Sequence, residues 1–155
     1  APAFPKTEIP EQKLEGAMQA APNFNIQFWC YSSGLWIVSG KVDLLPEHHK
    51  LVHNIANFIQ GKKRKPRHVG IFSWPMLDSP NIDQGPEVAS KYLRDHIHRL
   101  QEVSAVNKVI AFSDCGDWMN HLNPITTQEN IVQLLESPQS KKSLWQQLLP
   151  HQITE

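Results

Sequence analysis

The chain has 155 residues, and its fifteen Lys or Arg residues balance fifteen Asp or Glu residues. This length favours one domain with a real core, and a zero net charge gives no reason to expect nucleic acid or an acidic partner. No window approaches the roughly twenty apolar residues that cross a bilayer, and no signal peptide opens the chain, so we expect a soluble, cytoplasmic protein. Two cysteines are too few for a disulfide framework. The first residue is Ala1, which indicates a processed or trimmed chain.

The first part of the chain differs in composition from the rest. Residues 1–23 contain four prolines and few bulky apolar side chains, which is typical of an extended arm. We therefore predict a Pro-rich flexible arm over residues 1–23 and a single α/β domain over residues 24–155. Within that domain, the aromatic and β-branched runs at 25–31 and 35–39 are separated by Ser32, Ser33 and Gly34, a pattern that indicates a β-hairpin. A helix is predicted to start within residues 44–47 and to end at Gly61, because glycine is favoured just after the last helical residue.

The central part of the chain predicts a strand, a helix and a second strand. The apolar run 69–72 lies between prolines and is typical of a fully buried strand. Pro86 occupies a first helical position, and apolar residues from Val88 to Val103 recur on one side of the helix that follows. The run 109–112 is the second strand. Such a βαβ unit has parallel strands joined right-handedly, so we expect a mixed, mainly parallel sheet between helices.

The last third of the chain predicts helices. Thr126 and Glu129 have the spacing of a capping box ahead of an apolar run that begins at Ile131. Ser137 and Pro138 then start a final amphipathic helix.

An enzyme would carry its chemistry beyond the carboxyl ends of the strands. Cys115 follows the second strand of the βαβ unit, between Asp114 and Asp117. A thiol there could act as a nucleophile, but the two carboxylates oppose thiolate formation, so a small buried core residue is the better interpretation. A small α/β enzyme with a site around Cys115 is the alternative function, and we predict no catalytic set.

Metal and nucleic-acid sites have weaker signals. His49 and His53 are four residues apart on a helix, but Lys50 stands where zinc motifs place a Glu, so no metal or other cofactor is predicted. The basic run from Lys62 to Arg67 has no interleaved aromatic residues and favours a solvated loop over direct contact with nucleic acid. Neither a phosphate-cradling loop nor a dinucleotide fingerprint follows residues 71–72.

The tryptophan residues are the remaining indication of a function. Trp29 and Trp36 lie in the hairpin and are predicted to be core, whereas later tryptophans lie at strand ends or on the last helix, where an aromatic side chain can anchor a partner. A partner-binding patch is therefore predicted, anchored either by Trp145 with Leu144 and Leu148 or by Trp74 with Met76.

Two segments resemble a known family. The final segment, in which Pro138 is followed by Leu144, Trp145, Gln146 and Gln147, resembles the closing helix of the psi subunit of bacterial DNA polymerase III. The Trp-Pro pair at 74–75 and the Asp-Gln-Gly triplet at 83–85 resemble stretches of divergent gammaproteobacterial psi-like proteins. The order of elements extends the resemblance over roughly residues 24–149.

The resemblance implies a three-layer α/β/α sandwich with the topology of uracil-DNA glycosylases, without their enzymatic motifs. It also implies a non-catalytic subunit of the replicative polymerase holoenzyme. In that family the folded domain pairs with the chi subunit, which itself binds single-strand-binding protein, and an N-terminal peptide attaches to the clamp-loader ATPase subunits. The short aromatic and basic segment that makes this attachment is not visible in residues 1–23. The expected mechanism is scaffolding, with chi held near the clamp loader.

Overall fold

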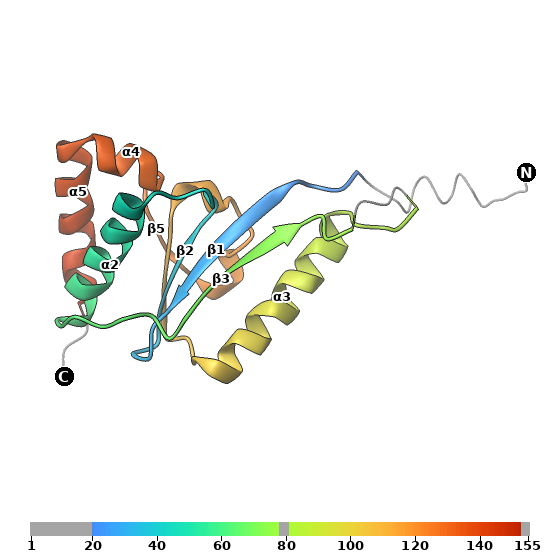
Figure 1. The fold of residues 1–155 in the computed structure, drawn as a ribbon, viewed down its shortest axis with the longest axis horizontal. Coiled ribbons are helices and arrows are strands. Elements are labelled where there is room, and N and C mark those ends of the chain that lie inside the picture. The colour runs from blue at the N-terminus through green and yellow to red at the C-terminus, as the bar shows by residue number, and fades with distance from the viewer. Residues whose placement is uncertain (1–19, 78–80, 153–155) are drawn as a thin grey trace, which may run out of the picture. The chain divides into compact units, whose positions relative to one another are not determined.

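The computed structural model describes residues 20–77 and 81–152 (Figure 1). They fall into two compact units: one holds residues 25–72 and 99–152, and the other holds residues 20–24, 73–77 and 81–98. Most of the predicted arm over residues 1–23 therefore lies outside the described residues. None of the described helices is long and apolar enough to cross a membrane.

The fold is mixed α/β, built on a five-stranded sheet with the order β3-β1-β2-β4-β5. The strands are β1 (Phe24–Cys30), β2 (Leu35–Ser39), β3 (His68–Trp74), β4 (Lys108–Ala111) and β5 (Ile125–Thr126). β1 and β2 are the predicted hairpin and pair antiparallel, with Gly34 at a positive φ of 93° in the turn that joins them. β2 pairs with β4 in parallel, and so does β4 with β5. The sheet is therefore mixed, as predicted.

The connection between β3 and β4 differs from the predicted compact βαβ unit. β3 runs opposite to its neighbour β1 (Figure 1), and the Arg67 amide just before it donates a hydrogen bond of 2.6 Å to the Cys30 carbonyl at the end of β1. β3 and β4 consequently point the same way, as expected, but the hairpin strands β1 and β2 lie between them. The hairpin strands β1 and β2 precede β3 in the chain, and they occupy the sheet positions between β3 and β4.

The prediction that residues 69–72 form a fully buried strand was wrong. β3 is an edge strand, and the side chains of Val69 and Ile71 are 46% and 49% exposed. Only Phe72 in this run is buried. An apolar run of this length fits a buried strand and a half-covered edge strand equally well, because the pattern does not say how far the covering helix reaches.

The helices are α2 (Pro46–Gln60), α3 (Pro86–Val103), α4 (Ile131–Glu136) and α5 (Pro138–Leu148). α2 ends as predicted at Gly61, which has a φ of 75° and whose amide donates to the Asn57 carbonyl. Short 3-10 turns cover Ser113–Cys115, Asn120–Leu122 and Leu149–His151.

The start of α4 corrects another prediction. Thr126 belongs to β5 and does not cap the helix. The capping box is formed instead by Asn130 and Gln133: the Gln133 amide donates to Oδ1 of Asn130 at 2.9 Å, and the Asn130 amide donates to Oε1 of Gln133 at 3.0 Å. Asn and Gln satisfy the free amides of a first turn in the same reciprocal way as the predicted pair.

One core joins the sheet of the larger unit to α2, α4 and α5, which lie together on the same side of it (Figure 1). Its buried members include Trp29, Tyr31, Ile37, Ile55, Ile59, Ile110, Leu134, Leu144 and Leu148. The residues that alternate with these on the strands, such as Phe28, Trp36 and Val38, are also buried. Both faces of the inner strands are therefore shielded from water, and the expected burial of Trp29 and Trp36 is confirmed.

The smaller unit is organised around Trp74. The Trp74 indole N–H donates to the Gln84 carbonyl at 2.8 Å, and its ring lies 5.5 Å from that of Tyr92. The Gln84 side chain makes two hydrogen bonds with the Leu77 backbone, of 2.9 and 2.7 Å. These contacts fix the segment after β3 and leave Met76 and Leu77 exposed.

Candidate partner-binding groove

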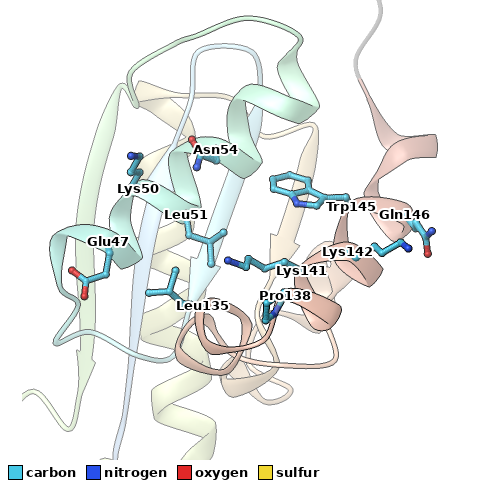
Figure 2. A pocket seen from close by; sticks show the side chains of 10 residues that line it. All are labelled: Glu47, Lys50, Leu51, Asn54, Leu135, Pro138, Lys141, Lys142, Trp145 and Gln146. Atoms are coloured by element: carbon cyan, nitrogen blue, oxygen red, sulfur yellow. The ribbon is translucent and has the colours of Figure 1, made fainter.

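A groove of about 590 Å³ separates α2 from the α4–α5 pair (Figure 2). α2 contributes Glu47, Lys50, Leu51 and Asn54 to one wall. The opposite wall carries Leu135 from the end of α4, and Pro138, Lys141 and Trp145 from α5. The groove thus has an apolar interior with charged side chains around it.

The sequence around Ser137 builds the second wall. The hydroxyl of Ser137 accepts a hydrogen bond of 3.2 Å from the Ser140 amide, and Pro138 occupies the first position of α5. This cap starts a new helix directly after α4 ends, as predicted. The sharp change of direction presents Leu135 and Trp145 to the same space (Figure 2).

Trp145 is the largest apolar side chain in the groove. It is half-buried, and its ring packs on Phe58 of α2 with centroids 4.9 Å apart and planes at 56°. The contact holds the indole in one orientation before any partner arrives, so little side-chain entropy is lost on binding. Phe58 was not among the residues predicted to form the partner-binding patch.

The five residues of the predicted patch lie in different places. Leu144 and Leu148 are 3% and 0% exposed and belong to the core, so their side chains stabilise the domain from within. Trp74 is buried in the smaller unit, where Met76 is exposed. Of the five, the groove contains only Trp145, and its neighbours there are Leu51, Leu135 and Pro138.

The charges around the groove are mostly positive. Lys50, Lys141 and Lys142 line it together with a single acidic side chain, Glu47. A partner surface with an apolar centre and an acidic margin would complement this arrangement.

The strand ends near Cys115 lack the features of a thiol-based site. Cys115 is buried, and burial, reinforced by the nearby Asp114 carboxylate, raises the pKa of its thiol to about 12. Oδ1 of Asp114 accepts a hydrogen bond of 2.8 Å from the Gly40 amide, and Oδ1 of Asp117 accepts one of 3.2 Å from the Asn120 side chain. The two carboxylates therefore hold local backbone and side chains, and burial keeps the Cys115 sulfur in its unreactive thiol form at neutral pH.

Both cysteines should be inert in the folded protein. Cys30 is also buried, and burial raises the pKa of its thiol to about 12. Because the thiolate is the reactive form, we expect iodoacetamide at neutral pH to label Cys30 and Cys115 at least about 100-fold more slowly than in urea-unfolded chain. Peptide mass mapping of the labelled protein checks this. Fast labelling of Cys115 in the folded protein would instead support a small α/β enzyme with a site around this residue.

Among residues 20–77 and 81–152, no group of three or more His, Cys, Asp or Glu side chains is arranged to hold a metal ion. His49 and His53, the residues with zinc-like spacing, line a different hollow on the other flank of α2. Comparisons of the chain with protein-family models, curated proteins and solved structures give no match.

Proposed function

We propose that this chain is a psi-like, non-catalytic subunit of a bacterial DNA polymerase III holoenzyme, acting in the cytoplasm in DNA replication. The proposal includes the three-layer α/β/α sandwich with glycosylase-like topology that the resemblance implies. The observation that carries it is the position of Trp145. Within the psi-like run Leu144, Trp145, Gln146 and Gln147, the tryptophan is the apolar residue that reaches a groove, whereas the leucine turns inward.

The proposed partner of the groove is the chi subunit. A partly exposed tryptophan in an apolar depression is the kind of residue that dominates the affinity of a protein interface. The positive margin formed by Lys50, Lys141 and Lys142 calls for acidic residues on the partner around an apolar centre.

The proposed mechanism is scaffolding. The folded domain holds chi in the groove, and the segment that precedes it connects the pair to the clamp-loader ATPase subunits. A tether of this kind raises the local concentration of chi at the loader without any new contact between the two.

Mixing the chain with purified chi tests the function. We expect light scattering coupled to size-exclusion chromatography to show a single species with the summed mass of one copy of each protein. The charge-reversed variant K63E/K65E is the control, because both lysines lie outside the groove, and it should form the same complex. Separate elution of the two native proteins at micromolar concentration would refute the proposed pairing.

A further inference from the structure

A second hollow, of about 700 Å³, lies on the other flank of α2. Its lining includes Trp29 of β1, His49 and His53 of α2, Val69 of β3, and Lys63 and Lys65 of the loop between α2 and β3. It shares no residue with the groove that contains Trp145. The hollow exists because α2 packs over the inner strands and leaves edge strand β3 partly uncovered, as the half-exposed side chains of Val69 and Ile71 show.

Charge is strongly segregated toward this hollow. Residues 48–77 contain six Lys or Arg residues and no Asp or Glu, whereas the rest of the chain has nine Lys or Arg against fifteen Asp or Glu. Of the six, Lys63, Arg64 and Lys65 line this hollow, and Lys50 lines the groove that contains Trp145. The zero net charge of the whole chain hides this basic stretch, which supplies every lining residue of the hollow except Trp29. The local field therefore favours an acidic ligand, contrary to what the overall composition indicates.

Backbone hydrogen bonds of Arg64 and Arg67 hold the basic loop of residues 62–67 in place, and its lysines are exposed. The Arg64 amide donates to Oδ1 of Asn57 at 3.2 Å, and the Arg67 amide donates to the Cys30 carbonyl at 2.6 Å. Lys63 and Lys65 are exposed, and neither has an ion-pair partner within the described part of the chain. A carboxylate on a ligand would find two available ammonium groups on a positioned backbone.

The floor of the hollow favours an extended peptide. Val69 belongs both to the hollow and to β3, whose outer edge pairs with no strand among the described residues. β3 carries no Lys, Glu or internal Pro, the residues that usually block addition of a further strand at a sheet edge. A partner segment can therefore place one apolar side chain on Val69 and continue along the edge as a strand.

Single-stranded nucleic acid matches this surface less well. Sequence-tolerant binding of bases relies on exposed aromatic faces, but Trp29 is wholly buried and its ring makes a T-shaped contact with the His49 ring, with centroids 5.6 Å apart. Burial, and to a smaller extent the neighbouring His49, lowers the pKa of His53. Its Nδ1 shares a hydrogen bond of 3.0 Å with the Tyr31 hydroxyl, so His53 adds a neutral imidazole at neutral pH and no phosphate-binding charge.

We propose that this hollow binds an extended acidic segment of a second partner protein, with an aliphatic side chain on Val69 and carboxylates on Lys63 and Lys65. The domain then carries two separate binding surfaces on the two flanks of α2, one for each partner.

Selection from a randomised peptide library displayed on phage, with the full chain as bait, tests the proposal. We expect enriched peptides in which Asp or Glu alternates with Val, Ile or Leu. Synthetic copies, titrated by fluorescence anisotropy, should bind K63E/K65E at least about tenfold more weakly than the native chain. The isosteric variant V69T should lose about threefold, because it exchanges one apolar methyl group for a hydroxyl.

The double variant K141E/K142E is the matched control, since it makes the same charge change at the groove and should bind these peptides within about twofold of the native chain. Equal loss in the two double variants, failure to enrich acidic peptides, or tighter binding of oligothymidine than of any selected peptide would each overturn the proposal. If K63E/K65E loses the selected peptides but still forms the chi complex, the loss concerns this hollow alone. The proposed pairing with chi is then tested separately.

Discussion

Replacing Leu148 by alanine should lower the free energy of unfolding by about 3 kcal/mol. Leu148 is fully buried in the core between the sheet, α2, α4 and α5, and truncating a buried leucine removes apolar contacts and leaves a cavity that the surroundings fill only in part. Urea denaturation followed by circular dichroism measures the change as a shift in midpoint at constant slope.

Leu149→Ala is the control for that measurement. Leu149 is the next residue in the chain but is exposed, so its truncation should change the free energy of unfolding by less than about 0.5 kcal/mol. An L148A protein as stable as the native chain, but unable to bind chi, would show that Leu148 meets the partner and does not belong to the core.

Helix geometry alone does not separate Leu148 from Trp145. Successive residues of an α-helix are rotated by about 100°, so Leu144 and Leu148 lie close together and Trp145 lies at the margin of the same face. The sequence pattern alone grouped all three as one apolar patch. It could not decide which face the core would occupy, because that depends on how α4 turns into α5 and where α2 lies.

Local signals predicted local structure well. The glycine at 61 and the Ser137-Pro138 pair mark helix ends whose hydrogen bonds are satisfied within a few residues, and both were located correctly. The start of α4 was misplaced because Asn130 and Gln133 satisfy the same hydrogen-bond requirement as the Thr126 and Glu129 pair.

The pairing of strands that lie far apart in the chain was harder to predict from the sequence. The sequence predicted the hairpin and the strands at 69–72 and 109–112, but the register and order of a sheet depend on contacts between segments far apart in the chain. Insertion of β1 and β2 between β3 and β4 moved β3 to the edge. The half-exposed Val69 and Ile71, and the hollow that Val69 lines, follow from that order and have no separate signature in the sequence.

Replacing Trp145 by alanine should weaken chi binding by about 2 kcal/mol or more, roughly thirtyfold in Kd, as truncation of an interface hot spot does. The indole lies in the groove between α2 and α5, already oriented by Phe58. Its truncation also removes the contact with Phe58 and packing on the core, so we expect the free energy of unfolding to fall by about 2 to 3 kcal/mol. Circular dichroism of W145A checks that the domain is folded under the conditions of the binding measurement.

Calorimetric titration of chi into the native chain, W145A and Q139A is the most direct test, because Gln139 is exposed on the same helix but outside the groove. We expect native and Q139A proteins to bind chi with the same affinity and W145A to bind at least about thirtyfold more weakly. Equal affinity for all three proteins would contradict a partner site at this groove.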